Sequence, residues 1–221
     1  AAAMILALAC VPASAEAQTI RPHLLVIFDT SGSMTEDPAG TAQNCDGSSG
    51  APCSGSGAAS RMYLAKSAVS QVVTQNQSAV AFGLMRYFQD EGSAINASLA
   101  YGGKVINYDG QNNCTIGGQV LVPGGDNSYT TILGWMNNQE SWPNDKELRA
   151  DGATPLAGAL ATALDHYKTV IIPGDLSRSC RGKYVLVITD GEETCGWDPT
   201  AAAAALMVVN VGGANYDVKT F

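Results

Sequence analysis

A run of apolar residues that stops abruptly at an acid is the feature that most constrains this chain. Residues 24–28 read Leu-Leu-Val-Ile-Phe, and residues 29–33 continue Asp-Thr-Ser-Gly-Ser. An unbroken apolar run is typical of a parallel strand covered on both faces, and open α/β sheets bind their ligands at the carboxyl ends of such strands. The run therefore predicts a central strand with Asp29, Ser31 and Ser33 at its functional end.

Strand and helix patterns alternate along the rest of the chain. The expected strands cover residues 80–88, 119–122 and 183–189, with an antiparallel or irregular one near 93–101 and another beginning near 217; the expected helices cover 61–74, 128–138, 156–167 and 199–209. The first helix carries one apolar stripe, formed by Met62, Ala65, Val69, Val72 and Val73. This alternation predicts an α/β fold with a doubly wound, mainly parallel sheet and helices on both faces. With 221 residues and 46% hydrophobic content, the chain can bury one core.

The turn after the first strand carries the ligand atoms of a hard cation. One carboxylate and two hydroxyls on alternate residues suit Mg²⁺, which takes oxygen ligands octahedrally at about 2.0–2.1 Å. Phosphate is a poorer fit, because no P-loop lysine follows. Taken singly, the same residues also suit ordinary turns. Likewise, Thr154 followed by Pro155 is a good helix N-cap with proline at the first helical position.

The Asp-x-Ser-x-Ser pattern resembles the metal-ion-dependent adhesion site of von Willebrand factor type A domains. Residues 151–156 (Asp-Gly-Ala-Thr-Pro-Leu) resemble the loop that supplies this family's threonine, and residues 185–192 (Val-Leu-Val-Ile-Thr-Asp-Gly-Glu) resemble the strand and turn that supply its last aspartate. The resemblance implies a Rossmann-like type A fold that binds Mg²⁺, or Mn²⁺ or Ca²⁺. The implied metal ligands are Asp29, Ser31, Ser33, Thr154 and Asp190.

The resemblance implies binding rather than turnover. Few anionic ligands come from the chain itself, so a carboxylate of a protein partner would complete the metal's coordination. The segment between Cys180 and Cys195 looks like that of type A domains in large bacterial surface proteins, among them pilus-tip adhesins. We therefore expect a metal-dependent adhesion module and no enzyme. The alternative is a structural or force-sensing module of a surface or pilus machine. A hydrolase is the weakest reading, because Ser31 stands where haloacid-dehalogenase-like phosphatases carry a second acid.

The two ends of the chain indicate an exported protein that belongs to a longer chain. Residues 1–17 read as a partial signal peptide with cleavage options after Ala15 or Ala17, although a lipoprotein anchor at Cys10 competes. Residues 18–221 then form the type A domain, located outside the cell, on its surface or in the periplasm, with no membrane insertion. Near residue 217 the last strand looks clipped, before the family's final strands. The net charge of −8 argues against nucleic acid as a partner.

Two insertions and the cysteines complete the expectations. The insertions cover residues 35–60 and 102–150, and the first leaves directly from the proposed metal turn. Export favours disulfides. Cys45 and Cys53 share one Gly/Ser-rich loop and are the expected pair, whereas Cys180 and Cys195 flank a strand and should lie too far apart. A zinc site is disfavoured because the chain has no Cys-x₂-Cys motif.

Overall fold

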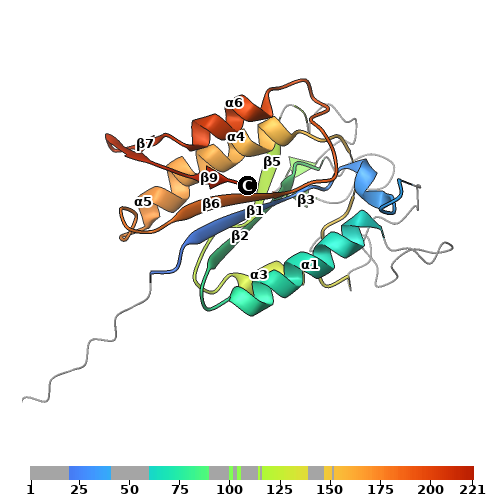
Figure 1. Ribbon diagram of the computed structural model, residues 1–221, viewed down its shortest axis with the longest axis horizontal. Helices are drawn as coiled ribbons and strands as arrows, with labels where there is room; N and C mark the ends of the chain where they lie inside the picture. Colours follow the sequence, from blue (N-terminus) through green and yellow to red (C-terminus); the bar gives the residue numbers. More distant parts are fainter. Residues whose placement is uncertain are drawn as a thin grey trace, which may run out of the picture.

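A five-stranded sheet forms the centre of the molecule (Figure 1). The structure is a computed structural model that describes residues 20–40, 60–89, 114, 116–138, 147–150 and 152–221, and the backbone of 100–101 and 104–105. In spatial order the strands are β5 (Gly118–Val122), β2 (Ala81–Tyr87), β1 (His23–Phe28), β6 (Lys183–Ile188) and β9 (Lys219–Thr220). All neighbours are parallel except β5, which is antiparallel to β2. The predicted α/β class with a mainly parallel sheet is confirmed.

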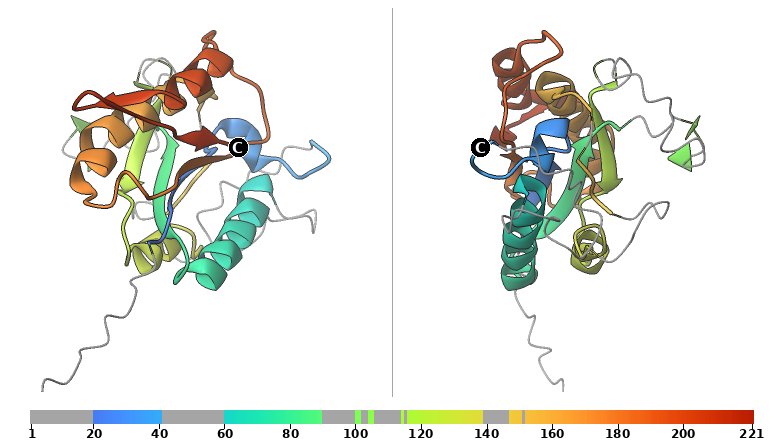
Figure 2. Two further views of the ribbon diagram at one scale, coloured as in Figure 1. Left: turned by 60° about the vertical axis from the view of Figure 1, so that its left-hand side comes forward. Right: turned by 90° about the vertical axis from the view of Figure 1, so that its right-hand side faces the viewer.

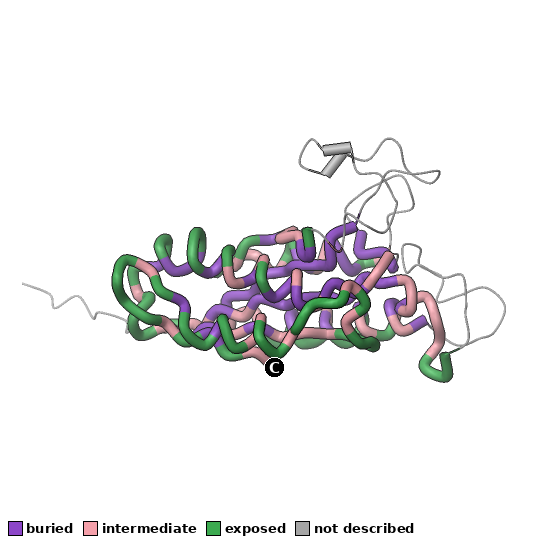
Figure 3. Tube along the Cα trace, turned by 90° about the horizontal axis from the view of Figure 1, so that it is seen from above, coloured by how far each residue is buried: buried purple, intermediate pink, exposed green. Residues whose placement is uncertain are grey.

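Helices cover both faces of this sheet (Figures 1 and 2). On one face lie α1 (Arg61–Asn76) and α3 (Tyr129–Gly134), and on the other lie α4 (Leu156–His166) and α6 (Pro199–Leu206). Successive side chains of a strand point to opposite faces. Leu25 and Ile27 of β1 accordingly join the core under α4, and Val26 and Phe28 join the core under α1. The unbroken apolar run of β1 thus supplies two cores, and buried chain concentrates in the central strands (Figure 3).

Helix α1 begins at Arg61 as expected but packs differently from the expectation in two respects. Its N-cap is Ser60, whose hydroxyl accepts a hydrogen bond from the amide of Tyr63 at 3.2 Å. Val72 is 46% exposed, so its predicted place in the buried stripe is wrong. Adjacent helical residues are about 100° apart, and Val73 already occupies the inward direction. Lys66, which no apolar pattern marks, is fully buried on the same face.

The other helices end at places that the sequence patterns did not locate. α4 passes into a wide helical turn (Tyr167–Ile171) and then into the short α5 (Ile172–Gly174), beyond the predicted end at 167. α6 stops at Leu206 rather than 209 because a hairpin follows, formed by β7 (Val209–Val211) and β8 (Ala214–Tyr216). Its two turn residues are glycines with φ of +60° and +83°, values that suit a tight hairpin.

Only residues 100–101 of the antiparallel or irregular strand predicted near 93–101 belong to the described part of the chain. Residues 93–99 lie outside the described residues, and β3 (Ala100–Tyr101) pairs only with β4 (Lys104–Val105) in a separate ribbon. β5 takes the position beside β2 instead. Within the described part of the chain, no helix has both the length and the apolar character to cross a membrane. The expected signal segment also lies outside the described residues.

Candidate metal site

Three segments meet at the carboxyl edge of the central strands. They are the turn after β1, which includes the short 3₁₀ helix η1 (Gly32–Thr35), the loop after β6, and the segment that leads into α4. Three backbone hydrogen bonds hold them together: Asp29 N–H to Ile188 O (2.8 Å), Gly32 N–H to Gly152 O (2.9 Å) and Thr194 N–H to Thr154 O (3.1 Å). The fold therefore brings together the three sequence segments in which the metal ligands were predicted.

A chain of hydrogen bonds links four of the five predicted residues. The carboxylate of Asp29 accepts from the amide of Ser31 at 2.7 Å and from the hydroxyl of Thr189 at 2.6 Å. The hydroxyls of Ser31 and Ser33 lie 3.0 Å apart. Ser33 in turn donates to Asp190 Oδ1 at 2.9 Å. Thr189, which fixes the second oxygen of Asp29, was not anticipated, although it directly precedes Asp190 in the sequence.

Thr154, the fifth predicted residue, lies at the same edge but makes a different contact. It is 4% exposed, and its amide donates to the hydroxyl of Thr194 at 2.7 Å. Pro155, not Thr154, occupies the N-cap position of α4, and no side-chain cap bond forms there. The capping alternative for Thr154 is therefore wrong, because the residue directly before the first helical residue, Leu156, is Pro155.

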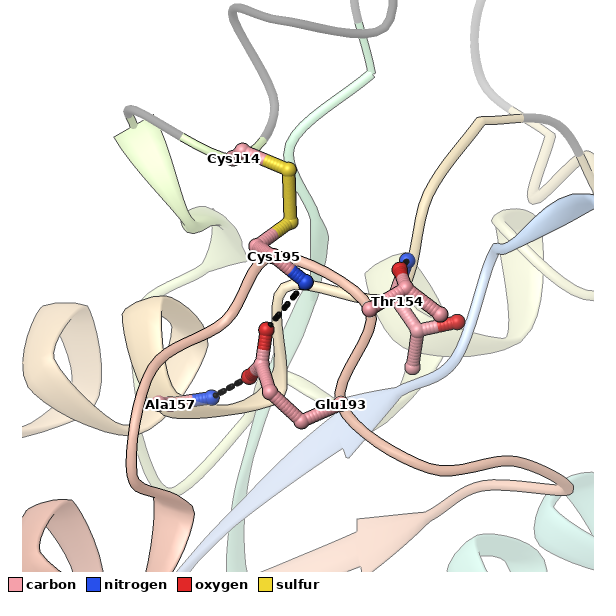
Figure 4. Close-up of a disulfide and its surroundings, with 6 residues drawn as sticks. Cys114, Thr154, Ala157, Glu193 and Cys195 are labelled. Atoms are coloured by element: carbon pink, nitrogen blue, oxygen red, sulfur yellow. Dashed lines mark hydrogen bonds between the residues drawn. A yellow bond between two sulfur atoms is a disulfide. The ribbon is translucent and has the colours of Figure 1, made fainter.

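The start of α4 is held instead by Glu193, which the sequence patterns did not single out. Its carboxylate accepts hydrogen bonds from the amides of Ala157 and Cys195, each at 2.7 Å (Figure 4). A carboxylate at a helix N-terminus satisfies a free amide and interacts favourably with the helix dipole. Glu193 thus joins the loop after β6 to the helix that follows Thr154.

The electrostatics of the site centre on Asp29. Its side chain belongs to a fully buried residue, and burial raises the pKa of its carboxyl. The hydrogen bonds from Ser31 and Thr189 oppose this rise, and the negative charge of Asp190 adds to it. A buried carboxylate with a second carboxylate nearby is an arrangement that a cation relieves.

Arg61 brings a positive charge to the rim of the site. Its Nη1 lies 2.5 Å from Asp190 Oδ2, 3.3 Å from Glu36 Oε2 and 3.4 Å from the carbonyl oxygen of Ser33. No motif marks Arg61, because 24 residues separate it from Glu36 in the sequence. Its amide nevertheless donates to the carbonyl of Glu36 at 2.8 Å, which joins the two ends of the first predicted insertion.

Two hydrogen-bonded oxygen pairs at this edge also have the separation found between neighbouring ligands of an octahedral cation. Neighbouring ligands of an octahedral ion at about 2.1 Å are separated by about 3.0 Å. The Ser31–Ser33 and Ser33–Asp190 oxygen pairs lie at 3.0 and 2.9 Å. No group of three or more His, Cys, Asp or Glu gathers anywhere in the described residues, so the donor set here depends on hydroxyls. Hydroxyl and carboxylate oxygens fit Mg²⁺, Mn²⁺ or Ca²⁺ better than zinc.

A disulfide fixes the loop that carries Glu193. Cys114 and Cys195 are bonded, with Cα atoms 5.2 Å apart and a sequence separation of 81 (Figure 4). Cys180 is free and exposed, which agrees with the expectation that it does not bridge to Cys195. The expected Cys45–Cys53 pair lies outside the described residues.

Comparisons with known proteins give limited matches. No protein-family profile matches the chain. A segment of 79 residues is 39% identical to the uncharacterized protein YwmD of Bacillus subtilis (strain 168), which covers 33% of this chain and 32% of that protein. Among solved structures, the PilB minor pilin from Streptococcus sanguinis and a point mutant of it are each 18% identical in sequence to this chain, with TM-scores of 0.43 and 0.45. These matches cover 79% and 82% of this chain. The chain spans about a third of the length of each of these proteins.

Proposed function

We propose that this chain is a divalent-metal-dependent protein-binding module of the von Willebrand factor type A kind. The observation that carries the proposal is the hydrogen-bonded row of Ser31, Ser33 and Asp190 oxygens at octahedral spacing, beside the buried Asp29. The position of this row supports the same reading, because ligands of open α/β sheets bind at the carboxyl ends of the strands.

The five predicted ligands would hold the ion in two ways. Ser31, Ser33 and Thr154 would offer neutral hydroxyl oxygens, and Asp29 and Asp190 would offer negative charge directly or through water. When bound, Mg²⁺, Mn²⁺ or Ca²⁺ supplies an electrophilic position for a carboxylate of a protein partner. Such a position would explain how a chain with a net charge of −8 binds an acidic group.

We propose a binding role rather than a catalytic one. His23 begins β1, at the end of the strand opposite Asp29, and His166 ends α4. Burial lowers the pKa of both imidazoles, and neither is hydrogen-bonded to a residue of the site. Neither histidine is therefore placed to act as a general base for a hydroxyl of the site.

We further propose that the protein is exported and acts outside the cytoplasm, as part of a longer chain. The Cys114–Cys195 disulfide supports this location, because disulfides persist mainly in oxidising compartments. The signal-like composition of residues 1–17 points the same way.

A structural module without metal-dependent binding is the second candidate function. The contact between Arg61 and Asp190 favours it, because a guanidinium can neutralise the site from within. In that case the carboxyl edge would serve as a packed, ion-paired end of the sheet.

Isothermal calorimetry with Mg²⁺ and Mn²⁺ separates these two functions. We expect the purified domain to take up one divalent ion and Asp29→Asn to take up none, with Asp126→Asn as the control. Asp126 pairs with Arg21 at 3.0 Å, and residue 21 lies before the amino end of β1. Absence of uptake by the wild type, or equal uptake by Asp29→Asn, would overturn the metal-dependent function and favour the structural one.

A further inference from the structure

Arg61 has a set of contacts that its place at the start of a helix does not explain. It is the first residue of α1, which has no acidic residue in its first turn. A cation at a helix N-terminus interacts unfavourably with the helix dipole. The hydroxyl of Ser60 already caps the helix, so α1 does not need the arginine in order to begin. The reason for a guanidinium here must lie in what it contacts.

Two of its three side-chain contacts are with predicted metal ligands, Ser33 and Asp190. One nitrogen, Nη1, lies within 3.4 Å of Asp190, Glu36 and the carbonyl oxygen of Ser33. The Arg61 and Asp190 side chains are 25% and 12% exposed, so solvent screens their attraction only partly. Ser33 and Asp190 are themselves two of the five predicted metal ligands. Arg61 therefore acts on the atoms that a divalent ion would use.

A guanidinium and a divalent ion compete at such a place for two reasons. Both draw on the negative charge of Asp190, and their positive charges repel each other across a few ångströms. When no divalent ion is bound, the guanidinium instead relieves the repulsion between the Asp29 and Asp190 carboxylates.

We propose that Arg61 is the internal counter-cation of the metal site, holding Asp190 when no divalent ion is bound and lowering the affinity for that ion. This inference rests on the proposed metal-binding function. It assigns to Arg61 the role of setting the ion concentration at which the site fills. A positioning role would have the opposite sign, because an arginine that only orients Asp190 for the metal would strengthen metal binding.

Calorimetric titration of the full chain with Mg²⁺ tests the assignment. We expect Arg61→Gln to bind Mg²⁺ about two- to fivefold more tightly than the wild type, as loss of a partly exposed ion pair implies. Arg61→Lys keeps the charge but not the fork of donors, and should fall between the two. Arg21→Gln is the matched control, because Arg21 is 22% exposed and pairs with Asp126 at 3.0 Å away from this site.

Thermal unfolding gives a second readout that does not depend on the titration. In EDTA, Arg61→Gln should melt below the wild type, because the two carboxylates lose their counter-charge. Saturating Mg²⁺ should raise its melting temperature more than it raises that of the wild type, since ligand binding stabilises the folded state.

The outcomes distinguish this inference from the proposed function. If the wild type binds Mg²⁺ and Arg61→Gln binds it equally or more weakly, the counter-cation role is wrong and the metal site stands. If only Arg61→Gln binds, Arg61 blocks the site and the counter-cation role is supported, while the metal-dependent function of the wild type fails. If neither binds, both proposals are overturned.

Discussion

Asp29 is the residue at which burial and function conflict most directly. Burial raises the pKa of its carboxyl above the ordinary value of 3.8, so the folded state holds this proton more tightly than the unfolded state does. Stability from this group is therefore full at low pH and declines as the pH rises from about 4 through the raised pKa. Once the pH exceeds the raised pKa, the ionised Asp29 lowers the stability of the fold.

Asp29→Asn should relieve this cost without breaking the surrounding hydrogen bonds. The asparagine oxygen can accept a hydrogen bond from the Ser31 amide, and the asparagine NH₂ group can donate one to the Thr189 hydroxyl. The Thr189 hydroxyl can then donate its own proton to the Gly191 carbonyl oxygen, which lies 3.2 Å away. In EDTA at pH 7, we expect the variant to melt at or above the wild-type temperature. Mg²⁺ should stabilise only the wild type. Differential scanning calorimetry at pH 4 and pH 7 would show the gap closing at pH 4, and a variant that melts well below the wild type in EDTA at pH 7 would contradict this account.

The sequence located the ligand residues of the site better than their supports. Asp29, Ser31, Ser33 and Asp190 follow strands whose apolar runs are visible in the sequence, so their meeting at one edge could be predicted. Their supports belong to loops that come close only in the folded chain. Thr189, Glu193 and Arg61 hold the site through contacts across 36 to 160 residues, and no local pattern encodes such contacts.

At the scale of elements, a buried ion pair attaches α1 to residues 147–150, which precede the loop that carries Thr154. Lys66 and Glu147 are both fully buried and form a salt bridge, and the Lys66 ammonium also donates to the Leu148 carbonyl at 3.0 Å. Removing one partner of a buried pair leaves the other charge uncompensated, which costs about 3–5 kcal/mol. Lys66→Met should lower the free energy of unfolding by about this amount.

The double variant Lys66→Met/Glu147→Gln provides the test of that account. It removes both charges, so its free energy of unfolding should lie closer to the wild type than that of Lys66→Met alone. Urea denaturation of the wild type, the two single variants and the double variant measures the difference. A double variant as unstable as the sum of its single variants would show that the two side chains act independently.

The disulfide is the second link between elements. It joins the segment before β5 to the loop after β6, and the sequence separation of 81 between the cysteines makes a long closed loop. The loop-entropy relation gives about 4.5 kcal/mol for this length, and measured effects are usually about 2–4 kcal/mol. Cys114→Ser/Cys195→Ser should therefore lower the melting temperature by about 4–16 °C. Cys180→Ser is the control, because Cys180 is free and exposed, and it should leave the melting temperature unchanged.

Element types were predictable where one physical signal dominated. The apolar runs of β1, β2 and β6 and the stripe of α4 gave their types and approximate positions. The β7–β8 hairpin was missed because its strands are three residues each, too short for alternation to stand out. Its Gly212-Gly213 pair was the available signal. The buried Lys66 could not be predicted, because its ion-pair partner lies 81 residues away.

For the whole molecule, the buried cores lie between the central strands and the two helical layers, and the candidate metal site lies at the carboxyl edge of those strands. Each layer packs on one set of alternating β1 side chains, and the core under α1 also includes Met34 of η1 but none of the five predicted ligands. The described ends of the first insertion also lie outside the two cores and are joined to each other. Its ends meet where the Arg61 amide bonds to the Glu36 carbonyl at 2.8 Å.

This closed stem leads to a prediction for residues 41–59. Gly40 lies beside the Arg61 guanidinium, and Ser60 immediately precedes that residue, so the two ends of the segment lie near each other. A short Gly/Ser linker from Gly40 to Ser60 should therefore preserve the fold. Loop-closure entropy changes slowly with length, so each halving of the loop should alter the free energy of unfolding by only about 0.6 kcal/mol.

The shortened protein should take up Mg²⁺ with nearly wild-type affinity, because the oxygens of Ser31, Ser33 and Asp190 are held by contacts within the stem and the sheet. What should change is the choice of protein partner, since the replaced segment leaves from the rim of the metal site. Calorimetry measures the Mg²⁺ affinity of the shortened protein, and thermal unfolding measures its stability. The wild type with a linker of equal length inserted in the Gly212-Gly213 turn controls for the change in chain length. Failure of the shortened protein to fold would mean that residues 41–59 belong to the core, and the independence of the two helical layers from this insertion would then be wrong.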